Sequence, residues 1–255
     1  MTDDPVAPRK RWYDDACGTA LALELVGERW SLLIMRELMF GPRRFGELKA
    51  SLHGISANVL TLRLEGLEQA GILGRRILPP PASVQVYELT PWGYESEKAI
   101  QELGRWAVRS PGHDPTLPFS AASLMLSART MYAGGMRGTV GFRLGRDSFV
   151  ATLTPEAISI RRTGAPEGQV VFEGDPRAIA AVIYGGRPLA DALADGSVRL
   201  GGDHAVAQDY ITRFPLPEKL GPPGAPRTGP APSGAVTSTA ALSDPTQPAA
   251  GSGGP

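Results

Sequence analysis

One stretch of sequence decides the fold of the first half of this chain: residues 43–89 read RRFGELKASLHGISANVLTLRLEGLEQAGILGRRILPPPASVQVYEL. Ser56 is a good N-cap for a helix over 57–70, and Gly71 occupies a favoured position just after its C-terminal end. Leucines at every third or fourth position give this helix one apolar stripe, which predicts a face buried against other helices. The opposite face of the helix is left for contacts with a partner.

The neighbouring residues complete a helical unit with a hairpin. Apolar residues recur at helical spacing before the decisive helix, and two short apolar runs after it are joined by a rigid proline-rich loop. The expected elements are helices over 18–26, 29–40, 43–52 and 57–70, strands over 72–78 and 84–89, and a last helix over 91–108. Three helices followed by a two-stranded hairpin predict a winged helix-turn-helix, whose third helix is narrow enough to enter a DNA major groove.

The composition is that of an ordinary globular chain. Among the 255 residues, 26 Lys and Arg face 26 Asp and Glu, and the two signs are balanced in both halves of the sequence. Because there is no overall positive field, a nucleic-acid site has to be a local patch. Cys17 is the only cysteine, which excludes an internal disulfide and a cysteine-built zinc site, and the three histidines lack metal-site spacing. We therefore expect no metal site.

The sequence favours a cytoplasmic protein with no membrane partner. Charged and polar residues open the chain without the apolar run of a signal peptide, and no stretch is long enough to span a membrane. Prolines and glycines near residues 110–118 mark a linker between two blocks. We expect a winged helix-turn-helix over 12–110, a smaller α+β block over 119–216, and a disordered tail rich in Pro, Gly and Ala over 217–255.

The outer face of the helix over 57–70 carries the residues that we expect to contact DNA bases, and basic residues flank it. The predicted base contacts are Asn58, Val59, Thr61 and Leu62, because Asn reads adenine edges and Thr or Leu can pack on thymine methyls. The predicted phosphate contacts are Arg43, Arg44, Lys49, Ser56, Arg75 and Arg76. The alternative is that these polar and basic side chains only form a solvated surface.

Motifs across residues 12–110 occur together in one protein family. They are Cys17-Gly, Leu25-Val-Gly-Glu-Arg-Trp30-Ser-Leu-Leu-Ile-Met-Arg-Glu-Leu38, Gly41-Pro-Arg-Arg-Phe45-Gly-Glu-Leu48, Gly54-Ile-Ser56, Leu60-Thr61, Leu64, Leu67-Glu68, Ala70-Gly71-Ile72-Leu73 and Tyr87-Glu-Leu-Thr90-Pro-Trp-Gly93. In combination they closely resemble the HxlR family of bacterial transcription regulators. The resemblance implies a homodimer on a short, roughly palindromic double-stranded DNA operator, with dimer contacts around residues 16–26 and 92–108.

Cys17 has two interpretations. Some HxlR members sense electrophiles or oxidants through a cysteine in this region, and a sensing thiol needs access and a lowered pKa. The basic residues at 9–11 favour the thiolate, whereas Asp14 and Asp15 lie nearer in sequence and oppose it. The interpretation that we favour is a small residue buried beneath the dimer interface. With one cysteine in each chain, a disulfide would have to join two subunits.

The second block carries shorter motifs, namely Val170-Val-Phe-Glu-Gly-Asp-Pro176, Leu189-Ala-Asp-Ala-Leu193 and Gly196-Ser-Val-Arg-Leu-Gly-Gly-Asp203. They give residues 138–216 a resemblance to the sterol-carrier-protein-type fold, whose members hold apolar ligands between a sheet and helices. The resemblance implies a pocket for a small apolar effector. The candidate lining residues are Phe142, Phe149, Ile179, Val182, Ile183, Tyr184 and Tyr210. The alternative is that these side chains fill a core.

Taken together, the sequence favours a dimeric, sequence-specific DNA-binding regulator, and more specifically a repressor. It contains no catalytic constellation, so we expect neither an enzyme nor a cofactor. Two other hypotheses stay open. In one, the chain is a lipid-binding or carrier protein that uses its winged helix for dimerisation; in the other, the second block is an enzyme.

Overall fold

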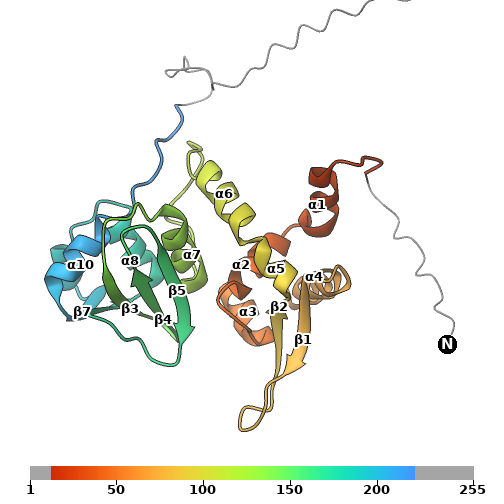
Figure 1. The fold of residues 1–255 in the computed structure, drawn as a ribbon, viewed down its shortest axis with the longest axis horizontal. Helices are drawn as coiled ribbons and strands as arrows, with labels where there is room; N and C mark the ends of the chain where they lie inside the picture. Colours follow the sequence, from red (N-terminus) through yellow and green to blue (C-terminus); the bar gives the residue numbers. More distant parts are fainter. Residues whose placement is uncertain (1–12, 222–255) are drawn as a thin grey trace, which may run out of the picture. The chain divides into compact units, whose positions relative to one another are not determined.

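The computed structural model describes residues 13–221, so the expected start of the first block at residue 12, the basic residues at 9–11 and most of the expected tail lie outside it. Its helices and strands form two consecutive groups (Figure 1). The winged-helix region, residues 13–110, contains α1 (Gly18–Val26), α2 (Ser31–Leu38), α3 (Phe45–Ser51), α4 (Ala57–Gln69), β1 (Leu73–Ile77), β2 (Gln85–Leu89), α5 (Pro91–Glu95) and α6 (Glu97–Ala107). The sheet region, residues 119–216, contains α7 (Ala121–Met131), β3 (Gly138–Leu144), β4 (Asp147–Leu153), β5 (Ile158–Thr163), β6 (Val170–Gly174), α8 (Pro176–Ile183), α9 (Leu189–Ala194), β7 (Val198–Gly202) and α10 (His204–Ile211). This order confirms a mixed α+β fold that begins with a winged helix-turn-helix.

Helices α2, α3 and α4 pack around the core of the winged-helix region. The leucine stripe of α4 (Leu60, Leu64 and Leu67) is buried together with Ile34 of α2 and Leu48 of α3. Burial of large aliphatic side chains contributes about 1.5–3 kcal/mol each. The stripe predicted from the sequence is therefore what fixes α4 in place.

The wing is an antiparallel hairpin of β1 and β2, in which Leu73 pairs with Leu89 and Arg75 with Tyr87. Backbone hydrogen bonds in both directions also join Tyr87 to Arg43, just before α3 (2.9 and 2.8 Å). The wing is thereby attached to the helical part at its base.

The last helix of the winged-helix region is divided, unlike the single helix expected over 91–108. It breaks at Ser96, between α5 and α6. The Ser96 hydroxyl donates to the Gly93 carbonyl oxygen at 2.7 Å, and such local hydrogen bonds compete with the regular helix pattern. The α-helical hydrogen-bond pattern is thereby interrupted immediately before α6.

The sheet region is a two-layer structure. Its strands lie in the order β5-β4-β3-β6-β7, with β3 and β6 parallel and the other neighbours antiparallel. The register aligns Phe142 with Phe149 on one side and with Phe172 on the other, so these rings share one face. Helices α7, α8 and α10 cover this apolar face (Figure 1).

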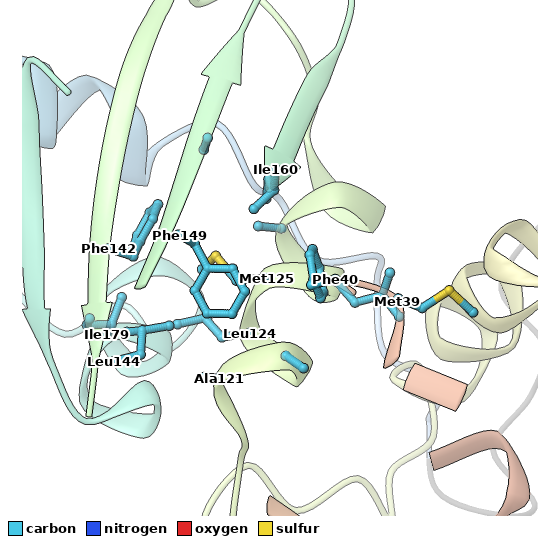
Figure 2. Packing of buried hydrophobic residues seen from close by; sticks show 14 of the residues in the cluster. Met39, Phe40, Ala121, Leu124, Met125, Phe142, Leu144, Phe149, Ile160 and Ile179 are labelled. Atoms are coloured by element: carbon cyan, nitrogen blue, oxygen red, sulfur yellow. The ribbon is translucent and has the colours of Figure 1, made fainter. Parts of the chain in front are cut away.

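One continuous apolar core joins the winged-helix and sheet regions. Phe40, which follows α2, meets Phe149 of β4 edge to face, with ring centroids 5.4 Å apart. Figure 2 shows Phe40 and Phe149 in one cluster with Leu124 and Met125 of α7, which are both fully buried. Because close-packed cores transmit displacements, α2 and the sheet region are mechanically connected.

Candidate DNA-binding surface

The outer face of α4 is free of other protein groups in the described part of the chain. Asn58, Thr61 and Leu62 are exposed, and Leu62 keeps 60% of its surface accessible. Val59 is half-buried and packs against the core, so it is the least accessible of the four predicted base contacts. The helix begins at Ser56, whose hydroxyl oxygen accepts a hydrogen bond from the Val59 amide at 3.2 Å.

Three of the predicted phosphate contacts lie on or beside α3 and at the N-terminal end of α4. Arg44 is exposed just before α3, where the Glu47 carboxylate accepts a hydrogen bond from its amide at 2.8 Å. Lys49 is half-buried on α3, and Ser56 is exposed. All three are accessible to a phosphate group, although Ser56 already caps α4.

The two wing arginines are exposed, but each is paired with a carboxylate of its own domain. Arg75 Nη2 lies 2.5 Å from Glu68 Oε2 on α4, and Arg76 pairs with Glu88 across the hairpin. The hydrogen bond from Arg75 to Glu68 raises the pKa of Arg75. Exposed ion pairs contribute only about 0–1 kcal/mol, so a phosphate can replace either carboxylate.

Arg43 does not occupy a phosphate-contacting position, and this prediction was wrong. The residue is only 7% exposed and points toward the sheet region. Its guanidinium donates to both carboxylate oxygens of Asp147, at 2.5 and 3.2 Å. The neighbouring Arg44 faces solvent, so the side chains of these two adjacent arginines lie on different sides of the winged-helix region.

Asp147 is the centre of a largely buried charge cluster that the sequence did not predict. Its carboxylate also lies 3.4 Å from Nε of Arg162 on β5. The Arg162 guanidinium lies over the Phe149 ring, 5.2 Å from the centroid, and donates to the Phe40 carbonyl oxygen at 3.4 Å. Burial and the charge of Arg43 lower the pKa of Arg162.

The cluster of Arg43, Asp147 and Arg162 forms a joint between the winged-helix and sheet regions, and further hydrogen bonds reinforce it. The buried Glu37 on α2 accepts from the hydroxyl of Ser120 at 2.7 Å and pairs with Arg36 at 2.8 Å. On the neighbouring helices, Arg129 of α7 donates to both carboxylate oxygens of Glu97 on α6, at 2.8 and 2.9 Å. The partners Glu37 and Ser120, and likewise Glu97 and Arg129, are far apart in sequence, so no local signal could have identified these two contacts.

The seven predicted effector-pocket residues belong to the packed interior of the sheet region. Phe142, Phe149, Ile179 and Tyr210 are fully buried, Val182 and Ile183 are buried, and Tyr184 is partly buried against the same core. The Phe142 ring stacks on Phe172 at 5.5 Å, and Tyr210 lies 5.6 Å from Phe142. The Tyr210 hydroxyl has no hydrogen-bond partner among the described residues.

Surface hollows occur elsewhere in the described part of the chain. One cleft of about 380 Å³ is lined by Arg143, Glu173 and Arg199, among others, and one of about 700 Å³ lies between α6, α7 and the turn before β5. None of the seven predicted pocket residues lines either cleft. Over residues 13–221, no group of three or more His, Cys, Asp or Glu side chains is arranged to hold a metal ion, and no helix is long and apolar enough to cross a membrane.

Cys17 is exposed at the start of α1 in the single chain. Hydrogen bonds from the backbone and the hydroxyl of Thr19 lower the pKa of its thiol. The Cys17 amide donates to Asp15 Oδ1 at 2.8 Å, so Asp15 is occupied by the backbone. The expected burial beneath a dimer interface stays a prediction.

Sequence comparisons agree with the geometry of the winged-helix region. The family of HxlR-like helix-turn-helix proteins matches residues 25–113. The HTH-type transcriptional regulator YodB of Bacillus subtilis is 40% identical over 86 residues, which cover 34% of this chain and 77% of YodB. This chain belongs to the HxlR family. It is accordingly a DNA-binding transcription regulator of the helix-turn-helix class, and the match does not extend to the sheet region.

Other relatives match about a third of this HxlR protein. An uncharacterized HTH-type transcriptional regulator of Mycobacterium bovis is 45% identical over 85 residues, and the chain spans 53% of that relative's length. The solved structure of reduced YodB is 37% identical and covers 36% of this chain and 92% of YodB, with a TM-score of 0.34. The family assignment rests on the sequence relatives.

Proposed function

We propose that this HxlR protein binds a palindromic operator as a homodimer and reads its sequence with the outer face of α4. The observation that carries the proposal is the two-sided character of α4, which has a buried leucine stripe and an opposite face with exposed Asn58, Thr61 and Leu62. Asn can make two hydrogen bonds to an adenine edge, while Thr and Leu can contact thymine methyls. Val59 contributes less because it is half-buried.

The phosphate contacts that we retain are Arg44, Lys49, Ser56, Arg75 and Arg76. Arg44 and Lys49 approach from α3, and the two wing arginines exchange their carboxylate partners for phosphates. Such contacts fix the register of the protein on the duplex without reading sequence. With four basic side chains per subunit, a dimer neutralises about eight phosphates, which corresponds to a salt slope of about −7.

Dimerisation is supported by exposed apolar side chains on the two helices named by the family resemblance. Leu21 and Leu23 lie exposed on α1, and Leu103 and Trp106 lie exposed on α6. Large exposed apolar groups on facing helices are typical of a subunit interface. A two-fold dimer built in this way would present two α4 helices about one DNA turn apart.

The test is selection of a binding sequence from random DNA, followed by a titration of affinity against salt. We expect sequence-selective binding with a slope of about −7. Binding that does not distinguish the selected from a scrambled sequence would favour the other hypothesis, a lipid carrier that uses the winged helix for dimerisation only.

For the sheet region, we propose a sterol-carrier-like domain that binds a small apolar effector and modulates repression in the cytoplasm. The region's aromatic interior supports an apolar ligand, and the unpaired Tyr210 hydroxyl offers it one polar contact. Since the interior is packed, a ligand must bind an open state more tightly than the closed one to shift the population. Native mass spectrometry of the purified protein tests for such a ligand. The relatives' names as transcriptional regulators support a role without catalysis.

A further inference from the structure

Helix α1 is an arm with few attachments to the rest of the winged-helix region. Ala20 is its only buried residue, Leu21 and Leu23 face solvent, and Leu25 and Val26 at its C-terminal end are half-buried against the core. The arm ends at Gly27 and is joined to α2 by a short turn that contains Glu28, Arg29 and Trp30. The position of α1 therefore depends on the packing of its C-terminal end and on this turn.

Arg63 connects the same turn to α4, the proposed recognition helix. Its Nη2 atom lies 2.6 Å from Glu28 Oε2, and its Nε atom donates to the Arg29 carbonyl oxygen at 3.2 Å. One guanidinium on α4 thus holds both a side chain and the backbone of the segment that carries α1.

The turn has a backbone conformation that neighbouring contacts must maintain. Trp30 has φ = 84°, in the left-handed region that residues with a side chain rarely adopt. Such conformations persist where surrounding contacts determine them. The contacts here are the Arg29 guanidinium, 5.3 Å from the centroid of the Trp30 ring, and the hydrogen bond from Arg63 to the Arg29 carbonyl.

Arg63 is poorly oriented for DNA. At 100° per residue, it lies about 60° from Leu60 in the buried stripe and about 140° from Asn58 on the outer face. The other flank of α4 carries Glu68, which pairs with Arg75 of the wing at 2.5 Å. The recognition helix is thus held on one flank to the arm and on the other to the wing.

We propose that Arg63 is a positioning residue that couples α1 to α4 and thereby sets the half-site spacing that a dimer accepts. The proposal rests on the proposed function, because α1 must contribute to the dimer and α4 must read DNA. A loosened connection lets the two recognition helices adopt more than one separation.

The experiment compares the full-length wild type and Arg63→Ala on two duplexes, the selected operator and the same operator with one base pair inserted between its half-sites. For the wild type, we expect clearly weaker binding to the lengthened operator. For Arg63→Ala, the preference for the native spacing should fall by about threefold to tenfold, as expected for loss of an ion pair in each subunit. A variant that is merely less stable would bind both duplexes with equally reduced affinity, and that result overturns the proposal.

Further variants separate positioning from phosphate contact. Glu28→Gln should reproduce the loss of spacing preference, and the double variant Glu28→Arg/Arg63→Glu should restore part of it. The matched control is Arg161→Ala, which removes an exposed pair of the same 2.6 Å length in the sheet region and should leave the preference unchanged. If Arg63→Ala instead makes the salt slope less steep by about 2 while the spacing preference stays, Arg63 contacts phosphate and the proposal is wrong.

The two proposals fail in different ways. If the wild type shows no sequence-selective binding, the proposed function fails and this inference fails with it. If the wild type binds selectively and distinguishes the two spacings, but Arg63→Ala and Glu28→Gln do so equally well, only the role of Arg63 is refuted.

Discussion

Asp147→Asn should weaken the joint between the winged-helix and sheet regions, because it removes the carboxylate that Arg43 and Arg162 share. Removing one partner of a buried ion pair costs about 3–5 kcal/mol, since a charge is left buried without compensation. The Asp147 side chain keeps 16% of its surface exposed, and Glu47 lies 3.8 Å from Arg43 Nε. Both features reduce the loss of stability, so we expect the free energy of unfolding to fall by about 3 kcal/mol.

The assay is urea unfolding at neutral pH, followed by circular dichroism and by tryptophan fluorescence. At about 2–4 °C per kcal/mol for a chain of this size, a thermal scan should show a midpoint about 6–12 °C lower. The double variant Arg43→Met/Asp147→Leu should be more stable than Asp147→Asn, because it leaves no unpaired charge at position 43. The recovery should be partial, because Arg162 still lacks its carboxylate partner. Transitions that differ between the two probes would indicate that the two regions then unfold separately.

The control is Glu167→Gln, which removes the exposed pair with Arg161 at 2.6 Å, where the two side chains are 60% and 68% exposed. That change should lower the free energy of unfolding by less than about 1 kcal/mol. If Asp147→Asn costs no more than the control, the cluster is an ordinary surface contact, and the reasoning about a buried joint is refuted.

Three further predictions concern the DNA-binding surface and the thiol. Asn58→Ala and Thr61→Ala should each weaken operator binding by about 5-fold to 150-fold at the positions they read, since a good base contact contributes about 1–3 kcal/mol; unchanged affinity and specificity would contradict the assigned face. Arg44→Ala should weaken binding to all sequences alike and make the salt slope less steep by about 2 in a dimer, and an unchanged slope would exclude a phosphate contact. Because Thr19 lowers the pKa of Cys17, alkylation should reach half its maximal rate at a lower pH than for an ordinary cysteine thiol, and Thr19→Val should move this midpoint upward. A midpoint that does not respond to Thr19→Val would show that the hydroxyl has no influence.

The recognition helix could be predicted almost completely because its determinants are local. The helix expected over 57–70 is observed as Ala57–Gln69, with Ser56 as its hydrogen-bonded cap. Gly71 follows with φ = 73°, a conformation that favours glycine. Cap, stripe and stop signal lie within one short segment, so no tertiary contact was needed to place α4.

The contacts between regions could not be predicted, because they depend on partners that are distant in sequence. Arg43 and Arg44 are identical neighbours, yet the first turns toward Asp147, 104 residues further along the chain, and the second faces solvent. The aromatic residues of the sheet region raise a similar difficulty. Composition and alternation place Phe142 and Tyr210 inside, but they do not distinguish a packed core from a ligand cavity.

The central claim, that the outer face of α4 reads DNA, is tested most directly by adding one negative charge to that face. Leu62 and Leu117 are both 60% exposed, so replacing either by glutamate should leave the unfolding midpoint near that of the wild type. Operator affinity, measured by fluorescence anisotropy, should fall by at least about 100-fold for Leu62→Glu, because a carboxylate would face the DNA, and should stay unchanged for Leu117→Glu. Equal affinities of the two folded variants would contradict the account.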